Sequence, residues 1–340
     1  MNNKIKKLLF ETEYLTGGYH MPPEFLSLII TFRCNFRCPS CSIWQKQSFD
    51  DELTEVEWLS AAENIKKTLK PNAFVEINGG EPLIRKNLTI KIIQELKKYF
   101  KSVALNSNGL LINQETVKEL ENAGLDILKI SFYSLDQETH NNLRGTSTAY
   151  DSALKAIKLM SASKIKLEVG VLVTSHNIED LPRLVERLQE TPNTTIVIQP
   201  LDESVELLEA KNNPKTTAIN DGLWPAPEVV QKTFSWLSKN NHNIKNSVLS
   251  LQAIRNYYLD RASALRYRCF AGQRNLVIYP NGEITFCFKR GSVGNIKNKP
   301  LNTTLKGAKK ERLAIKKCPK YCRIIGCNFS RGIKELFIKK

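Results

Sequence analysis

The sequence predicts an α/β protein: a partial (β/α)6 barrel followed by a small C-terminal domain that opens in a β-hairpin. Three observations lead to this prediction. Short apolar runs rich in β-branched residues alternate with amphipathic helical patterns between residues 25 and 199. The repeat occurs six times over roughly 200 residues, which indicates a parallel sheet, open or closed into a partial barrel. Near the C-terminus, Pro280-Asn281-Gly282 separates two β-rich runs, as in a hairpin turn.

The predicted strands and helices alternate along the chain. Each strand is a short apolar run: Phe25–Thr31, Ala73–Asn78, Ser102–Asn106, Ile127–Phe132, Leu167–Thr174 and Thr194–Gln199. Each helix has apolar residues three and four positions apart: Glu55–Thr68, Leu88–Phe100, Gln114–Ala123, Tyr150–Met160 and Ile178–Leu188. Asn113 and Asn177 precede the third and fifth helices, where an amide oxygen can cap the first turn. The chemistry of such folds lies at the carboxyl ends of the strands, so residues that follow each strand are candidates for a site.

The pattern changes after the sixth strand, where a linker or an excursion over the barrel mouth is predicted around Pro214, Pro225 and Pro227. Further helices are expected at Glu228–Leu237 and Val248–Tyr258, and the hairpin strands at Leu276–Tyr279 and Glu283–Phe288. We therefore expect an N-terminal extension at residues 1–24, the barrel at 25–215, a linker and helical region at 216–262, and the C-terminal domain at 263–340.

The composition is that of a globular protein, with 41% hydrophobic and 25% charged residues. The longest apolar run near the start, Phe25–Ile30, is too short to span a bilayer, and no signal peptide is visible. We therefore expect a cytoplasmic protein that stays out of the membrane. The net charge is +16, and the chain from Lys297 onward carries fourteen Lys or Arg and two acids. This basic tail either attracts an acidic protein, nucleic acid or membrane surface, or is a solvated face.

The eight cysteines fall in two groups, and in a cytosolic chain such groups more often hold a metal or an iron–sulfur cluster than form disulfides. The first group is Cys34, Cys38 and Cys41, a C-x3-C-x2-C spacing directly after the first predicted strand. Three thiolates can bind three irons of a 4Fe–4S cube and leave the fourth iron open for a chelating ligand. A zinc site completed by His20 or by a distant thiol is the alternative.

This spacing in the loop after strand one resembles the motif of the radical S-adenosylmethionine (SAM) superfamily. The resemblance implies that the amino and carboxylate groups of SAM chelate the open iron. It also implies that an electron from the cluster cleaves SAM to a 5′-deoxyadenosyl radical, which abstracts a hydrogen from an unreactive carbon. The family usually has an aromatic residue before the third cysteine, near the adenine. Here that residue is Ser40, and the candidates to fill the space are Phe36, Ile43 and Trp44.

The residues after the second strand resemble another motif of this superfamily. Asn78-Gly79-Gly80-Glu81-Pro82 is similar to the family's GGEP segment. Two glycines let a backbone pass close to a ligand, and a carboxylate can bind an ammonium group. The resemblance implies that Gly79, Gly80 and Glu81 hold the methionine amino group of SAM. Taken alone, two glycines after a strand are a common turn.

Three weaker matches follow in the order that the family shows. Ser107-Asn108-Gly109 resembles the family's turn after strand three. The segment from Ser131 to Asp136 resembles a serine- and aspartate-bearing segment in which Ser131 or Ser134 faces the ribose. Arg144-Gly145 resembles the arginine that pairs with the cofactor carboxylate, which a guanidinium binds through two hydrogen bonds. Each match alone is also an ordinary turn or surface residue.

The second group of cysteines begins with Cys269 and Cys287, which stand on either side of the predicted hairpin turn, and continues with Cys318, Cys322 and Cys327. With Gly294-Asn295-Ile296, the pattern resembles the SPASM and twitch domains that carry auxiliary iron–sulfur clusters. The full SPASM pattern has seven cysteines, so five suit the shorter twitch arrangement, with one auxiliary 4Fe–4S cluster and one spare thiol. Cys269 and Cys287 are the most secure ligands of this set, and the sequence does not say which thiol is spare. A structural zinc site of four thiolates is the alternative.

These resemblances imply a radical SAM enzyme that abstracts hydrogen from a peptide or a small molecule, with the auxiliary cluster as electron acceptor. The product classes are a modified peptide or an oxidised alcohol of a sugar or aminocyclitol. The four histidines form no pair, so no catalytic acid or base is assigned. The expected protein partner is an acidic flavodoxin or ferredoxin that docks near the basic tail. A zinc-stabilised nucleic-acid-binding protein is the more distant alternative, which the few aromatic residues in the tail do not favour.

Overall fold

The structure is a computed structural model that describes residues 3–46, 48–202, 204–205, 218–219, 221–324 and 329–330. Its strands are β1 (Phe25–Ile29), β2 (Phe74–Asn78), β3 (Ser102–Ser107), β4 (Ile127–Ser131), β5 (Lys166–Val173), β6 (Thr194–Pro200), β7 (Ser204–Val205), β8 (Ala218–Ile219), β9 (Arg268–Cys269), β10 (Asn275–Ile278), β11 (Glu283–Thr285), β12 (Gly294–Asn295) and β13 (Phe329–Ser330). Its helices are α1 (Asn3–Thr16), α2 (Glu55–Thr68), α3 (Lys86–Lys97), α4 (Gln114–Asn122), α5 (Gln137–Arg144), α6 (Ala149–Met160), α7 (Leu181–Gln189), α8 (Pro227–Lys239), α9 (Val248–Leu259), α10 (Ala271–Arg274), α11 (Leu301–Gly307) and α12 (Lys309–Lys316).

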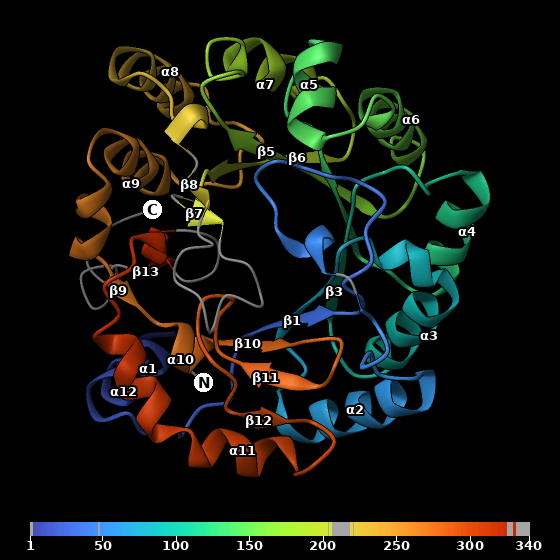
Figure 1. Ribbon diagram of the computed structural model, residues 1–340, viewed down its shortest axis with the longest axis vertical. Coiled ribbons are helices and arrows are strands. Elements are labelled where there is room, and N and C mark those ends of the chain that lie inside the picture. The colour runs from blue at the N-terminus through green and yellow to red at the C-terminus, as the bar shows by residue number, and fades with distance from the viewer. Residues whose placement is uncertain are drawn as a thin grey trace.

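The first six strands form a parallel sheet in chain order, and α2 to α7 cover its outer face (Figure 1). The sheet curves because twisted parallel strands are each followed by a helix on the same face. Along β2, Val75 and Ile77 are buried, whereas Glu76 and Asn78 on the opposite face are half-buried. The two ends of the sheet, β6 and β12, are not paired with each other. The predicted partial barrel is therefore confirmed.

The C-terminal hairpin continues the barrel sheet. Strand β10 pairs in parallel with β1, Phe25 facing Asn275 and Leu28 facing Ile278, and β11 and β12 follow it antiparallel. The sequence predicted this hairpin with a second strand that reached Phe288, whereas β11 ends at Thr285. The hairpin pairs the edge of β1, whose backbone groups need partners. One hydrophobic core accordingly runs from the barrel strands to α11 and α12.

Several helices had no range in the sequence prediction, and α5 and α1 are two of them. Helix α5 is polar over most of its length and buries few side chains, so it lacks a clear apolar period. Its ends carry the signals that define it: the Asp136 carboxylate accepts a hydrogen bond from the Thr139 N–H, and Gly145 closes the helix at φ 65°. Helix α1 packs Phe10 and Tyr14 against Phe270, a contact that no local pattern indicates.

The two predicted caps had different outcomes. The Asn113 side chain accepts a hydrogen bond from Thr116 N–H, which confirms it as the cap of α4. The prediction for Asn177 is wrong, because α7 begins four residues later at Leu181, with Asp180 before it and Pro182 in the first turn. Asn177 is 2% exposed and bonds elsewhere: its amide oxygen accepts from Thr174, and its amide nitrogen donates to the carbonyls of Tyr133 and Leu172.

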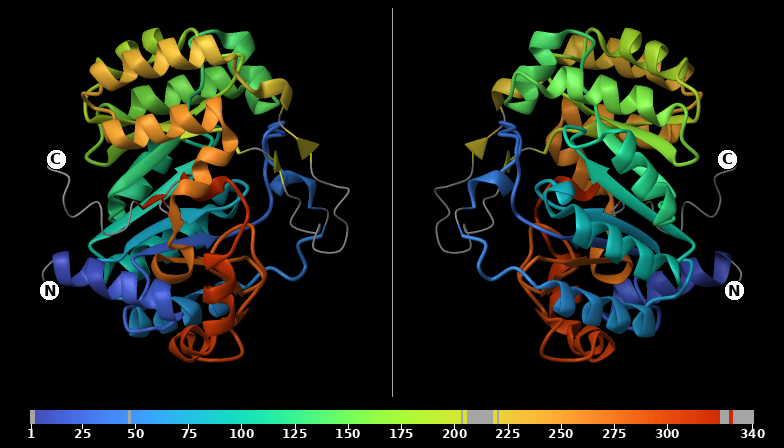
Figure 2. Two further views of the ribbon diagram at one scale, coloured as in Figure 1. Left: turned by 90° about the vertical axis from the view of Figure 1, so that its left-hand side faces the viewer. Right: turned by 90° about the vertical axis from the view of Figure 1, so that its right-hand side faces the viewer.

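Figure 2 shows the molecule from two sides, with α11 and α12 at the end opposite α7 and α8. Within the described residues, no helix is long and apolar enough to cross a bilayer. Part of the predicted linker, including Pro214, lies outside the described residues, as do Cys327 and the chain beyond Ser330, whereas Pro227 begins α8.

Substitution of Asn177 by Ala tests the hydrogen bonds that join the loop after β4 to the end of β5. We expect the free energy of unfolding to fall by about 2–3 kcal/mol, because buried carbonyls and a buried N–H lose their partner. Urea unfolding followed by circular dichroism measures it. The control is Asn302→Ala on the exposed face of α11, which we expect to change stability by less than about 0.5 kcal/mol. Equal effects of the two substitutions would contradict the assignment.

Candidate functional site

The first cysteine group lies in the loop between β1 and α2, where side chains and backbone hold one another closely. Cys34 and Cys41 are partly buried against the cluster of Phe36, Cys38 and Ala149. The indole N–H of Trp44 donates to the carbonyl of Cys38 at 3.1 Å. The guanidinium of Arg37 donates to the carbonyls of Cys34 and Phe36 at 2.8 and 2.9 Å. The loop therefore has a fixed shape before any ligand binds.

Burial controls the acidity of these thiols. Burial, together with the charges of Glu81, Cys38 and Cys41, raises the pKa of Cys34 to about 11, and the hydrogen bond from the Phe36 N–H opposes the rise. Burial also raises the pKa of Cys41. A bound iron reverses this preference, since the thiolate is the form that ligates metal. Three mutually close, partly buried thiols fit a cluster better than three exposed ones would, because a cluster also requires shielding from water.

The described residues contain no group of three His, Cys, Asp or Glu side chains placed to hold a metal ion. His20, the residue expected to complete a zinc site, lies in the segment between α1 and β1, where its backbone N–H donates to the carboxylate of Glu13.

The double glycine after β2 binds the cysteine loop through its backbone. The N–H of Gly80 donates to the carbonyl of Thr31, and the N–H of Glu81 donates to the carbonyl of Arg33, both at 2.8 Å. A Cβ added to Gly80 would lie 2.2 Å from the Arg33 carbonyl oxygen, a distance that no side chain can adopt. Glycine is therefore required here by the close approach of two backbones.

Glu81 joins the loops that follow β2 and β3. It is fully buried, and its carboxylate accepts hydrogen bonds from the Leu83 N–H at 3.1 Å, the Ser107 hydroxyl at 3.1 Å and the Asn108 N–H at 2.7 Å. Burial raises its pKa, and these hydrogen bonds oppose the rise. Asn108 in turn donates to the Asn35 side chain in the cysteine loop at 2.6 Å. Gly79, Gly80, Glu81, Ser107 and Asn108 thus surround the cysteine loop, and Glu81 acts as a brace between loops.

Arg144 places a buried positive charge beside the thiols. It is 9% exposed, and its guanidinium donates to the Tyr133 hydroxyl at 2.9 Å and lies against the rings of Tyr133 and Phe36. Burial lowers its pKa, but Tyr133, Cys38 and Cys41 outweigh burial and raise it. The Nε of Arg144 has no partner among the described residues. An unsatisfied buried cation of this kind favours an anionic ligand at the same place.

The backbone of the segment from Arg144 to Gly145 also touches the cysteine loop. The Cys38 thiol donates to the Arg144 carbonyl at 3.3 Å. A Cβ on Gly145 would lie 2.2 Å from the Arg37 carbonyl oxygen, and its φ of 65° also favours glycine. The end of α5 is thus fixed against the loop, which holds Arg144 in place.

The remaining sequence candidates lie near this centre with different roles. Ser131 ends β4 and is half-buried, whereas the Ser134 hydroxyl accepts from the Asp136 N–H in the turn before α5. Phe36 is 1% exposed, so it is not open to an adenine ring, whereas Trp44 is half-buried.

His140 is a buried residue that the sequence analysis did not assign to the site. Its Nδ1 accepts a hydrogen bond from the Tyr133 N–H, and burial with the Arg144 charge lowers its pKa to about 3. The signal for His140 was its i, i+4 spacing from Arg144.

A polar network inside the barrel was also absent from the sequence prediction. Lys129 on β4 pairs with Glu76 on β2 and lies 3.4 Å from Glu168 on β5, which pairs with Lys245. Burial lowers the pKa of Lys129, but the two carboxylates outweigh burial and raise it. Asn78 donates to the Ser27 hydroxyl at 2.6 Å and accepts from Asn106, which extends the network to β1 and β3. The barrel interior is therefore polar, and the charge of its four ionised residues cancels.

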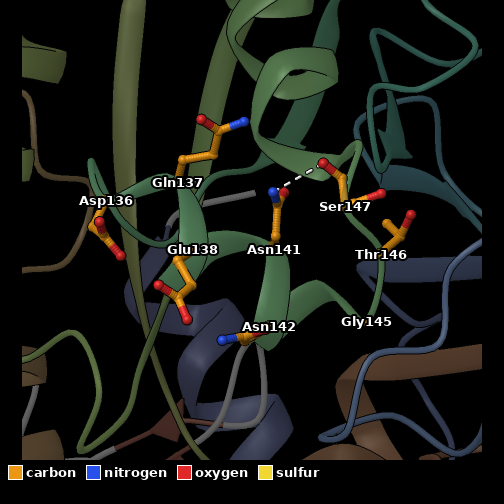
Figure 3. Close-up of a pocket in the computed structure, with 8 residues that line it drawn as sticks. All are labelled: Asp136, Gln137, Glu138, Asn141, Asn142, Gly145, Thr146 and Ser147. Atoms are coloured by element: carbon orange, nitrogen blue, oxygen red, sulfur yellow. Dashed lines mark hydrogen bonds between the residues drawn. The ribbon is translucent and has the colours of Figure 1, made fainter.

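A cavity of about 640 Å³ is lined by residues of α5 and of the segments that flank it (Figure 3). Its lining is polar: Asp136, Gln137, Glu138, Asn141, Asn142, Gly145, Thr146 and Ser147. Asn141 donates to the Ser147 carbonyl at 2.9 Å across it. None of the residues predicted to bind SAM or iron lines this cavity, so we assign it no cofactor.

Four thiols of the second cysteine group, Cys269, Cys287, Cys318 and Cys322, are partly buried. Burial raises the pKa of Cys287 and of Cys322 to about 12 in each case, and the charge of Cys269 raises both. Burial raises the pKa of Cys269 as well, with a contribution from Cys318. The pKa values of Cys269, Cys287 and Cys322 are thus each affected by at least one other thiol of this group. Cys327, the fifth predicted ligand, lies outside the described residues.

Two family models match the chain. The radical SAM superfamily matches residues 28–188, which contain the first cysteine group. The SPASM iron–sulfur cluster-binding domain matches residues 269–328, which contain the second. SAM and iron–sulfur clusters are the cofactors of these domains.

Known proteins share this architecture. PqqA peptide cyclase of Granulibacter bethesdensis is 24% identical over 269 residues, which are 78% of this chain and 68% of that protein. SuiB of Streptococcus suis bound to the precursor peptide SuiA has a TM-score of 0.63 at 16% identity, over 89% of this chain and 68% of that chain. The anSMEcpe enzyme with AdoMet and the Cp18Cys peptide has a TM-score of 0.61 at 17% identity, over 86% and 82%. The chain therefore contains a radical SAM domain followed by a SPASM iron–sulfur cluster-binding domain.

Proposed function

We propose that this enzyme cleaves SAM reductively at a cluster on Cys34, Cys38 and Cys41 and modifies a peptide by hydrogen abstraction. The observation that carries the proposal is the buried guanidinium of Arg144, with an unsatisfied Nε, beside two of three mutually close thiols. This arrangement combines ligands for three irons with a cation suited to a carboxylate. When bound, the cluster and SAM supply a 5′-deoxyadenosyl radical.

The chain's own residues bind and orient the cofactor in this proposal. Arg144 pairs with the SAM carboxylate, and Gly79 and Gly80 let the cofactor approach the backbone. Because Glu81 already accepts three hydrogen bonds from the protein, it contributes chiefly by bracing the loops that hold the amino group. Ser131, at the end of β4, is the candidate for the ribose. Trp44, which is half-buried beside Cys38, is the candidate for the adenine in place of an aromatic residue at Ser40.

Two observations favour a peptide substrate over a small molecule. The relatives include a peptide cyclase and enzymes whose structures hold bound peptides. The barrel interior carries amides and ionised groups, which suit the polar backbone of a peptide.

We further propose that four of the five thiols Cys269, Cys287, Cys318, Cys322 and Cys327 hold one auxiliary 4Fe–4S cluster and that the fifth is spare. The partial burial of Cys269, Cys287, Cys318 and Cys322, and the influence of neighbouring thiols on the pKa values of Cys269, Cys287 and Cys322, support a common site. With all four positions filled by protein, the auxiliary cluster has no open iron for substrate. Its role is then to accept the electron that remains on the substrate after hydrogen abstraction.

Replacing Cys34, Cys38 and Cys41 together by Ala tests the first cluster. We expect the iron content to fall from roughly eight to roughly four per chain, since one of two cubes is lost. Production of 5′-deoxyadenosine from SAM and dithionite, followed by chromatography under anaerobic conditions, should stop. A variant that still cleaves SAM at the native rate would refute the proposal.

Cys287→Ala tests the auxiliary cluster. SAM cleavage should continue because the first cluster is intact, while modification of the peptide, measured by mass spectrometry, should be lost. Asn302→Ala, on the exposed face of α11, is the control and should keep both activities and the full iron content. Native peptide modification by the Cys287 variant would contradict the proposed role of the auxiliary cluster.

Gly80→Ala tests whether the contact between the loops positions the site. The added Cβ would displace the cysteine loop, so we expect the rate of SAM cleavage to fall about 100-fold, as for a shift of about 1 Å in a reacting group. Gly291→Ala is the control, because nothing lies within 4 Å of a Cβ added there. Native activity of the Gly80 variant would show that the contact is dispensable.

A further inference from the structure

One guanidinium joins the peptide segments that carry the second cysteine group. It belongs to Arg323, which directly follows Cys322. Its Nη1 donates at 2.9 Å to the carbonyl of Tyr267, two residues before Cys269, and its Nη2 donates to the carbonyl of Cys318. Burial raises the pKa of the Cys269 thiol, and the charge of Arg323 opposes this rise. The guanidinium therefore lies close to several of the thiols proposed to hold the auxiliary cluster.

Part of this guanidinium has no partner. An arginine side chain has five N–H donors and no acceptor. The Nη1 of Arg323 uses both of its donors, the second on the Leu265 carbonyl at 3.3 Å. The Nε is buried and has no hydrogen-bond partner among the described residues. Because a buried N–H without an acceptor is costly, we expect an acceptor beside Nε when the site is loaded.

The charge of Arg323 is also not cancelled locally. Two cations between β11 and β12 are paired with carboxylates: the Arg290 guanidinium donates to Glu311 at 2.6 and 3.0 Å, and Lys289 lies 2.9 Å from Asp202. No such ion pair joins Arg323 to a carboxylate in the described part of the chain. Arg323 thus brings an uncompensated positive charge and an unused donor to the second cysteine group.

We propose that Arg323 donates a hydrogen bond through Nε to a sulfur of the auxiliary cluster and raises the reduction potential of that cluster. The inference rests on the proposed function, in which the cluster is reduced by one electron from the substrate radical, a step in which no bond forms or breaks. Reduction adds one negative charge to the cluster. A nearby cation and an N–H donor stabilise the more negative state, because net charge and hydrogen bonds to the sulfurs set the potential of such clusters. Arg323 then makes the auxiliary cluster a better electron acceptor.

A purely structural role is the alternative. The hydrogen bonds from Arg323 to three carbonyls hold residues 265–267 against residues 318–323. That role would change how much cluster the protein binds, but it would leave the potential of an assembled cluster unchanged. The potential therefore distinguishes the two roles.

The test measures this potential in full-length protein with Cys34, Cys38 and Cys41 replaced by Ala, so that only the auxiliary cluster contributes a signal. A redox titration is followed by electron paramagnetic resonance, and iron content is measured on the same samples. In R323Q the potential should fall by at least about 59 mV, the equivalent of a tenfold change in a one-electron equilibrium. The matched control is Arg266→Gln, the same charge change on an exposed side chain three residues before Cys269. It should keep the potential of the parent protein.

The variant R323K decides the case in which R323Q binds no iron. Lysine keeps the positive charge but lacks the buried Nε donor, so its potential should lie below that of the parent protein. A parent potential in R323Q, or in R323K where R323Q binds no iron, would overturn the proposal. Loss of iron from both variants would overturn it in favour of the structural role. A parent protein without iron would instead contradict the proposed function, and the inference would fall with it.

Discussion

The site depends on the close contact between the cysteine loop and two glycine backbones. Gly80 approaches it from the end of β2 and Gly145 from the end of α5, each so near a carbonyl of the loop that a Cβ would collide with it. Because β2 and α5 belong to the barrel, these contacts transmit the rigidity of the barrel to a loop that has little regular structure. The positions of the three thiols therefore follow from the packing of the fold, which is how a catalytic geometry is held in advance of its ligands.

Charge is balanced around this contact in a way that leaves one group unsatisfied. Glu81 is buried with three donors, and the ionised groups inside the barrel cancel one another. Arg144 has a phenol and two aromatic rings as neighbours, and no carboxylate ion pair with a described residue. A buried cation without an anion is costly in the free protein, and this cost is recovered when an anionic ligand binds. Arg144 is thus the residue whose environment most directly implies a bound carboxylate.

Local patterns predicted the parts of the structure that local physics controls. Alternating strands and amphipathic helices gave the barrel, and the cysteine spacing gave the candidate ligands, since thiols that are close in sequence need little tertiary structure to meet. The pairing of β10 with β1 was beyond such reasoning, because it joins residues 250 positions apart. Two further features could not be predicted because they join segments that are distant in the sequence. Glu81, which the motif assigned to the cofactor, instead accepts hydrogen bonds from the loop after β3, and the charges inside the barrel come from four separate segments. Helix α5 was missed although its caps were visible, because its side chains lack an apolar period.

The central claim is that the loop of Cys34, Cys38 and Cys41 holds a 4Fe–4S cluster with one iron open to SAM. Electron paramagnetic resonance of the dithionite-reduced protein, with Cys269, Cys287, Cys318 and Cys322 replaced by Ala, tests it most directly. The account predicts the signal of one reduced 4Fe–4S cluster, whose g values shift when SAM is added because the cofactor becomes a ligand of the open iron. A protein that contains zinc in place of iron, or a cluster whose spectrum is identical with and without SAM, would contradict it.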